Sequence, residues 1–388
     1  MGQNLKNRLR RIRSVSGTKQ DIPEGKAGQP GKISGESGID ALWPGWKEAG
    51  YKTLKRVVPC DLPFELPSAF PAELPLLLYD IYRFGRIPRL DDLVFFDLET
   101  TGLSGGAGTV AFLAAFGRFS RAGFEITQYL LLDYPGENDF VKQAAAELCA
   151  SPLVVSYNGK SFDSQIMKTR CLMKGIKIPD YCHADLLHPA RRLWKKALPD
   201  CSQATVEVSV LGLDREGDVS GALAPDIWFS FLRSGKNDEL LSICGHNLRD
   251  IKGLASLFLC FGQIAASPFE SLKKFNVDEE ALALLWQRGV KRNQFFFNDE
   301  ASRDCSKTGE LLLKRAADKG SLRAALAMAI KAEWRLNDPA LALSYVKIAL
   351  SNPEIPERLR EELERRQQRL LAKILHYSRL TGSTSTSR

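Results

Sequence analysis

The segment LVFFDLE, residues 93–99, has the pattern of a buried strand that ends in two carboxylates. Successive side chains of a strand point to opposite faces, so Asp97 and Glu99 are expected on the same face. Unpaired buried charge is costly, and two acids at the end of an apolar run therefore indicate a bound cation. The alternative is a solvated strand end whose acids pair with a nearby lysine or arginine.

The residues that follow predict the rest of a sheet. TVAFLAAFGRF (109–119) and FEITQYLLL (124–132) suit two more strands of an antiparallel meander. The next expected elements are a helix after Gly136, a strand at 153–157, a helix at 161–175 and a strand at 181–185. The order predicts an α/β fold: three antiparallel strands followed by parallel β-α-β units, in a mixed sheet with helices on both faces.

Two further acids lie in helical patterns. Asp163 stands in the first turn of the helix expected at 161–175, where the helix dipole ordinarily favours an acid. Asp250 lies in GHNLRDIKGLASLF, and His246 is four residues before it, on the same helix face. Taken alone, Asp163 is an ordinary acid at the start of a helix. His246 and Asp250, taken alone, are an ordinary hydrogen-bonded pair on a helix surface.

Together the four acids favour a metal site. Asp97, Glu99, Asp163 and Asp250 would form an oxygen-lined pocket suited to Mg²⁺ or Mn²⁺. Two such ions about 3.5–4 Å apart can hold the attacking and leaving oxygens of an in-line phosphoryl displacement. His246 is the candidate general base, because histidine is the side chain most often used for proton transfer near neutral pH.

Three short segments resemble the motifs of the DEDD 3′–5′ exonucleases, in the ribonuclease H-like superfamily. FFDLETTGL (95–103) resembles the first motif. YNGKSFD (157–163) is similar to the second motif as found in the proofreading domain of family B DNA polymerases, and HNLRDI (246–251) resembles the third. The chain is similar to the YprB-type ribonuclease H-like proteins, with a tetratricopeptide-like C-terminal region.

The resemblance implies a 3′–5′ exonuclease in which the four acids, Asp97, Glu99, Asp163 and Asp250, bind two Mg²⁺ or Mn²⁺ ions, with Asp97 bridging them. One departure concerns His246, which stands four residues before Asp250, where this branch of the superfamily has tyrosine. Histidine-type members place their histidine five residues before the aspartate.

Three residues beside the motifs are candidate substrate contacts: Thr100, Asn158 and Lys160. Asn158 could bind a phosphate of the substrate, or it could hold the turn after 153–157. Lys160 could contact the nucleic-acid backbone, or it could be an ordinary exposed lysine.

Composition changes along the chain predict five regions. They are a basic disordered tail at 1–48, a proline-rich connector at 49–89, the exonuclease domain at 90–268, a helical tetratricopeptide-like domain at 269–377 and a disordered tail at 378–388. A plain helical bundle is the alternative for the fourth region, since no second copy stands at a clean 34-residue period.

The net positive charge lies at the ends of this 388-residue chain, which has 54 basic and 46 acidic side chains and a net charge of +8. Residues 1–50 carry nine basic and five acidic side chains, and residues 301–388 carry seventeen and ten. Basic ends favour a polyanionic partner such as DNA or RNA. A solubilising surface is the alternative.

Other classes of protein are excluded by composition. No window approaches the roughly 18 uninterrupted apolar residues of a membrane helix, so a membrane-spanning protein and a membrane partner are not expected. The eight cysteines form no Cys-x-x-Cys pair, and there are only four histidines. This argues against a zinc or disulfide scaffold and for buried thiols in a cytoplasmic protein.

The sequence therefore predicts a hydrolase, a metal-dependent nuclease that cleaves phosphodiester bonds of DNA or RNA. Two alternatives stay open. One is a nucleic-acid-binding protein with weakened catalysis, suggested by the position of His246 and the basic ends. The other is a scaffold whose C-terminal helices dock a protein partner.

Overall fold

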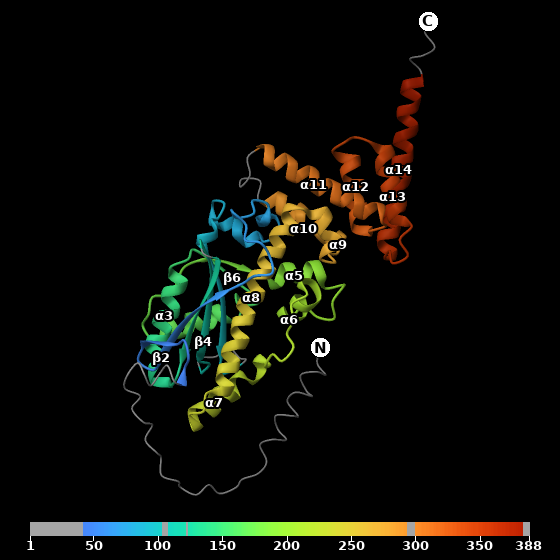
Figure 1. The fold of residues 1–388 in the computed structure, drawn as a ribbon. Helices are drawn as coiled ribbons and strands as arrows, with labels where there is room; N and C mark the ends of the chain where they lie inside the picture. Colours follow the sequence, from blue (N-terminus) through green and yellow to red (C-terminus); the bar gives the residue numbers. More distant parts are fainter. Residues whose placement is uncertain (1–41, 103–107, 122, 293–298, 383–388) are drawn as a thin grey trace, which may run out of the picture. The chain divides into compact units, whose positions relative to one another are not determined.

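A computed structural model describes residues 42–102, 108–121, 123–292 and 299–382 of the chain (Figure 1). The chain divides between residues 44 and 45, and the second unit, residues 45–388, holds nearly all of the described residues. Of the predicted N-terminal tail, residues 1–41 lie outside the described residues, as do residues 383–388 of the predicted C-terminal tail.

The second unit is built on a seven-stranded mixed sheet with the strand order β1-β2-β5-β4-β3-β6-β7. The strands β3 (Leu93–Thr100), β4 (Ala111–Ser120) and β5 (Gly123–Leu131) form the predicted antiparallel meander, and β6 (Leu153–Ser156) and β7 (Cys182–Asp185) continue the sheet. Strand β6 runs parallel to β3 and β7 parallel to β6, as predicted.

Two strands of the sheet were not predicted. β1 (Lys47–Gly50) and β2 (Thr53–Cys60) pair with each other, and β2 pairs with β5 along its whole length. Residues 47–48 are therefore strand where the sequence suggested a tail, and residues 49–50 and 53–60 are strand where it suggested a connector. The prolines misled the prediction because only Pro59 lies within β2, near its end. Beyond β2 the connector holds the short 3-10 helices η1 (Leu74–Leu76) and η2 (Tyr79–Phe84).

Different helices cover the two faces of the sheet (Figure 1). On one face, the ring of Phe95 packs edge-on against Phe258 of α8 (Asp238–Ala266), with 5.4 Å between centroids. On the other face, Phe116 packs against Tyr129, whose hydroxyl donates a hydrogen bond to Glu147 of α3 (Glu137–Cys149). The odd-numbered residues of β3 thus face α8.

The remaining helices follow in chain order. They are the 3-10 turns η3 (Leu90–Asp92) and η4 (Tyr134–Gly136), α4 (Asp163–Met173), α5 (Leu187–Trp194), α6 (Gln203–Val206), the π-helical turn η5 (Glu207–Leu211), the 3-10 turn η6 (Gly221–Leu223), α7 (Ala224–Ser234), α9 (Pro268–Lys274), α10 (Glu279–Arg292), α11 (Asp299–Asp318), α12 (Leu322–Trp334), α13 (Pro339–Leu350) and α14 (Glu357–Gly382).

The C-terminal helices are joined to the sheet region through α5. Trp194 Nε1 donates to the carbonyl of Phe275 at 2.9 Å, and the amide of Asp278 donates to the carbonyl of Leu193 at 3.1 Å. Helix α14 reaches Gly382, so residues 378–382 are helical instead of belonging to a tail. The proposed domain boundary near residue 269 and the tetratricopeptide-like character of the helices stay predictions.

Among the described residues, no helix is both long enough and apolar enough to cross a membrane.

Candidate metal centre

Strand β3 carries two acids of the candidate site toward α8. Asp97 and Glu99 share the face of Phe95, as the alternation of a strand requires. Glu99 is 8% exposed, in keeping with its place at the end of a buried strand. The strand therefore delivers two carboxylates to the surface of one helix.

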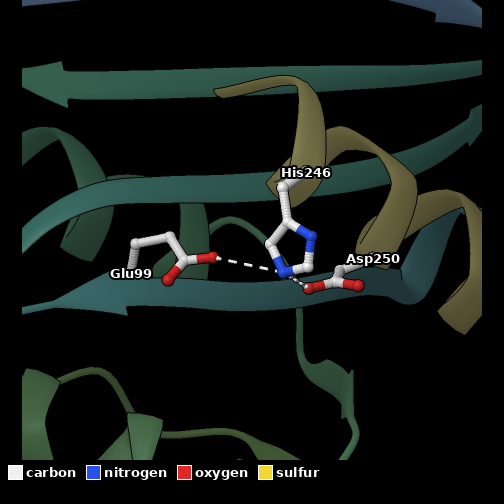
Figure 2. Close-up of side chains that lie close together, drawn as sticks. All are labelled: Glu99, His246 and Asp250. Atoms are coloured by element: carbon white, nitrogen blue, oxygen red, sulfur yellow. Dashed lines mark ion pairs between the residues drawn. The ribbon is translucent and has the colours of Figure 1, made fainter. Parts of the chain in front are cut away.

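Helix α8 meets these acids with one of its turns. His246 Nε2 lies 3.2 Å from Asp250 Oδ2 and 3.9 Å from Glu99 Oε1. Figure 2 shows the three side chains meeting between the strand and the helix. Asn247, between the two predicted residues, donates from Nδ2 to Asp97 Oδ2 at 2.7 Å. One helical turn thus contacts both acids of β3.

Asp163 begins α4, and its carboxylate faces the interior instead of solvent. It is 6% exposed, and no lysine, arginine or histidine of the described chain lies within ion-pair distance of it. Gly159 leaves room for it, because a Cβ there would stand 2.9 Å from Asp163 Oδ2. The structure therefore leaves a buried acid without a cationic partner.

The environment of these acids opposes their ionisation. Burial, followed by the negative charges of Asp250 and Asp163, raises the pKa of both Asp97 and Glu99 well above the usual range. Burial also raises the pKa of Asp163 to about 7. Such a concentration of buried negative charge is stabilised by a divalent cation.

A second layer around Asp250 was not predicted from the sequence. Arg215 Nη2 contacts Asp250 Oδ1 at 2.6 Å and also pairs with Glu207, and Nη1 of the same guanidinium lies 3.1 Å from Asp218. Asp218 Oδ2 lies 2.9 Å from His246 Nδ1. Asp250 is thus held by an arginine through one oxygen and faces His246 with the other.

Burial and ion pairs act in opposite directions on the two carboxylates beside Arg215, Asp218 and Glu207. Burial opposes the charge of Asp218, but the hydrogen bond with His246 and the charges of Arg215 and Arg249 hold its pKa below the usual value. Burial raises the pKa of Glu207 to about 7, against the opposing effect of Arg215. Nothing in the local sequence around Arg215 and Asp218 indicates these contacts, because the residues lie in an irregular segment.

A chain of hydrogen bonds leads from Asp97 into the sheet. Asn247 Oδ1 accepts from Gln128 Nε2 at 2.7 Å, and Gln128 Oε1 accepts from Arg56 Nε at 2.7 Å. The Arg56 guanidinium lies over the ring of Trp46, 4.6 Å from its centroid. Gln128 and Asn247 are fully buried, so this chain fixes the donor that faces Asp97.

The three predicted substrate contacts have local partners. The Thr100 hydroxyl donates to the carbonyl of Gly102 at 2.9 Å. Asn158 has a φ of 64° and accepts from the Ser161 hydroxyl, which fits the alternative that it holds the turn. Lys160 Nζ pairs with Asp80 Oδ2 at 2.8 Å and is 42% exposed. Within the described part of the chain, Thr100, Asn158 and Lys160 form no side-chain hydrogen bond or ion pair with the acid cluster.

Asp185, at the end of β7, holds the turn that leads to Asp163. Its carboxylate accepts hydrogen bonds from the amides of Asn158, Lys160 and Leu187 at 2.8 to 3.1 Å. Three amide donors explain why this buried acid needs no cation. Asp185 therefore holds the turn at residues 158–160 that precedes α4.

The donor set fits a divalent metal ion. One oxygen of Glu99, one of Asp250 and a ring nitrogen of His246 lie within 4.8 Å of one another. The partly exposed carboxylate of Asp97 and the buried carboxylate of Asp163 repel these acids electrostatically. Carboxylate oxygens suit Mg²⁺ and Mn²⁺, and an imidazole nitrogen adds affinity for transition metals.

Comparison with known proteins agrees with the architecture. Residues 94–260 match the family model of the RNase H superfamily. The uncharacterized protein YprB of Bacillus subtilis (strain 168) is 33% identical over 252 residues. That match covers 64% of this chain and 58% of YprB, so the chain spans less than two thirds of its relative's length.

A family B DNA polymerase from the hyperthermophilic archaeon Pyrobaculum calidifontis was also found in the comparison of structures. The TM-score is 0.35 at 12% sequence identity, over 50% of this chain and 28% of the polymerase. The sequence matches carry the comparison: residues 94–260, which hold the sheet from β3 onward and the acid cluster, are similar to the RNase H superfamily.

Proposed function

We propose that the protein is a metal-dependent nuclease that removes nucleotides from the 3′ end of DNA or RNA by hydrolysis of phosphodiester bonds. The observation that supports it is the convergence of Asp97 and Glu99, Asp163, and Asp250 from three distant segments. Asp97, Glu99 and Asp163 have no lysine or arginine partner within the described part of the chain.

In this proposal the four carboxylates hold two Mg²⁺ or Mn²⁺ ions. When bound, such a pair activates a water and stabilises the leaving oxygen of a phosphodiester. Asn247 orients Asp97 by donating to its Oδ2. Buried packing around β3 and α8 keeps the carboxylates fixed, which lowers the reorganisation needed when substrate binds.

Substrate contacts are proposed beside the acid cluster. Lys160 is still the best candidate for a backbone phosphate, because its ammonium is partly exposed on the turn that precedes Asp163. Binding there would require Lys160 to share its charge between Asp80 and the phosphate. Thr100 and Asn158 are proposed to shape the same surface through their backbone positions.

The proposal is tested with purified full-length protein, Mn²⁺ or Mg²⁺, and end-labelled DNA and RNA strands. A ladder that shortens from the 3′ end and disappears with EDTA is expected. Asp97→Asn and Asp163→Asn should each reduce cleavage by at least about 100-fold, because each removes a charge that holds the ions.

Asp304→Asn is the matched control, since Asp304 is an exposed acid that pairs with Lys307 on α11. It should cleave like the natural protein. Undiminished cleavage by Asp97→Asn and Asp163→Asn would exclude the proposed site. Cleavage at internal positions, seen with strands labelled at either end, would indicate an endonuclease instead of an exonuclease.

A second function, nucleic-acid binding with weak catalysis, is favoured by the contact between Arg215 and Asp250. An arginine bound to one oxygen of Asp250 competes with a metal ion for that carboxylate. If this function is correct, the protein binds labelled strands in EDTA and shows no cleavage after addition of Mn²⁺.

A protein partner for the C-terminal helices is a separate proposal. Trp334 at the end of α12 is 66% exposed, and Ile330 one turn earlier is 42% exposed. Exposed tryptophan is typical of binding surfaces. Such a partner would be identified by cross-linking the natural protein in cells. Trp334→Ala should reduce the amount of cross-linked partner.

A further inference from the structure

The ring of His246 is oriented so that its Nε2 atom faces the acid cluster. Nε2 lies 3.2 Å from Asp250 Oδ2 and 3.9 Å from Glu99 Oε1 (Figure 2). Donor atoms about 2.0–2.2 Å from one ion lie roughly 3 Å apart when adjacent and roughly 4.3 Å apart when opposite. The separations of these three atoms are compatible with a shared ion.

The other nitrogen of the ring is fixed by a carboxylate. His246 Nδ1 lies 2.9 Å from Asp218 Oδ2, and Asp218 is in turn held by Arg249 at 2.8 Å and by Arg215 at 3.1 Å. A carboxylate that accepts the Nδ1 proton leaves the Nε2 lone pair available and fixes the ring, as is usual for metal-binding histidines.

The backbone leaves room beside Nε2. A Cβ at Gly221 would stand 2.9 Å from His246 Nε2 and 3.9 Å from Glu99 Oε1. The glycine in η6 therefore keeps side-chain atoms out of the space that Nε2 and Glu99 share. Asp163 supplies an independent sign that the cluster suits a cation, since its carboxylate is 6% exposed and has no cationic partner among the described residues.

We propose that His246 is a direct nitrogen ligand of a divalent cation in this site, with Asp218 as its positioning residue, and that the site prefers Mn²⁺ to Mg²⁺. The proposal rests on the metal site of the proposed nuclease. A general base must approach a water and stand apart from the ion, whereas a ligand must touch it. Imidazole nitrogen favours transition metals over Mg²⁺, which gives the preference its chemical reason.

The test is pulsed electron paramagnetic resonance of the full-length protein loaded with Mn²⁺, without nucleic acid. We expect modulation from a directly bound ¹⁴N nucleus, replaced by a ¹⁵N signal after labelling of histidine. The signal should vanish in His246→Gln and persist in His376→Gln, a control at an exposed histidine of α14.

Affinity measurements complete the test, with free Mn²⁺ followed by its resonance signal and Mg²⁺ added as competitor. Asp218→Asn should weaken Mn²⁺ binding by about 10-fold to 100-fold, as changes at residues behind a ligand do. Gly221→Ala should also weaken it while His246 is intact. His246→Gln should lower the ratio of Mn²⁺ to Mg²⁺ affinity by at least about 10-fold.

Bound Mn²⁺ without nitrogen coupling in the natural protein would overturn the proposal, and this measurement needs no variant to fold. An unchanged metal preference in a folded His246→Gln would overturn it as well. In both cases cleavage with Mg²⁺ or Mn²⁺ would leave the proposed nuclease intact, whereas absence of any metal binding and any cleavage would exclude both.

Discussion

At the scale of a single residue, Asp163 shows that an acid of the candidate site lowers the stability of the folded protein without metal. The start of a helix favours an acid, yet this carboxylate is buried and its pKa is raised to about 7. Between the ordinary pKa of 3.8 and about 7, the folded state binds more protons than the unfolded state. Stability without metal should therefore fall as pH rises through this window.

Asp163→Asn should remove that pH dependence and raise the free energy of unfolding at pH 8 in EDTA. The gain is at most about 4 kcal/mol, from roughly three pKa units, and it should be small at pH 4. Urea unfolding at both pH values measures it. Equal stabilisation at pH 4 and pH 8 would show that the effect is not due to the charge.

His183 is the opposite case, a partly buried histidine whose ring contacts Ser164 of the same helix. Its ring nitrogens lie 2.7 Å from the Ser156 hydroxyl and 3.1 Å from the Ser164 hydroxyl, and burial lowers its pKa to about 4. Here the unfolded state binds more protons between pH 4 and the ordinary 6.5. Stability should be fully present above pH 6.5 and be lost as pH falls toward 4.

His183→Gln should flatten this acid dependence, which amounts to at most about 3 kcal/mol between pH 6.5 and pH 4. The slope of the unfolding free energy between pH 5 and 6.5 measures it. His376→Gln serves as the comparison at an exposed position. A slope that His183→Gln leaves unchanged would assign the acid sensitivity to other groups.

At the scale of elements, β3 and α8 form the site because a strand and a helix present complementary side chains. The strand supplies Asp97 and Glu99 on one face, and the turn of α8 from His246 to Asp250 lies against them. Gln128 of β5 adds a buried amide that holds Asn247 in place. Residues of β3, α8 and β5 therefore together determine the orientation of the Asp97 carboxylate.

Asn247→Ala should weaken Mn²⁺ binding by about 10-fold to 100-fold, because Asp97 loses the donor that orients it. Gln128→Ala should weaken binding less, and the double variant should resemble Asn247→Ala, since both act through one chain of hydrogen bonds. Calorimetry of Mn²⁺ binding measures all three.

Gln143→Ala is the matched control for this cycle. Its amide donates to the Ala49 carbonyl on the α3 side of the sheet, away from the acids. Metal affinity should be unchanged in this variant. Fully additive losses in the double variant would show that Gln128 and Asn247 act independently of each other.

At the scale of the whole molecule, the cluster joins segments near residues 97, 163 and 250, which are far apart in the chain. A cation that binds this cluster in the folded state finds no preformed site in the unfolded chain. Metal binding should therefore stabilise the fold as a whole, and not only the residues around the ion.

We expect Mn²⁺ at 100 times its Kd to raise the free energy of unfolding by about 2.7 kcal/mol. Thermal unfolding with and without Mn²⁺ measures the shift, and EDTA should reverse it. Asp97→Asn should lose most of the shift, whereas Asp304→Asn should keep it. A similar shift in both variants would indicate that Mn²⁺ binds elsewhere.

The sequence by itself determined the mixed sheet from β3 to β7, because apolar runs and their alternation report which faces are buried. It also singled out the acids, since a carboxylate after an apolar run is conspicuous. It did not reveal β2, whose polar residues and Pro59 are tolerated because β5 supplies the pairing partner.

Only the tertiary structure decided which residues surround the acids. Arg215 and Asp218 lie in an irregular segment, and Gln128 and Asn247 stand in patterns that predict only a strand and a helix. Their hydrogen bonds join residues that are far apart in sequence, and periodicity carries information only about near neighbours. The packing of α8 on β3 is what brings these groups together.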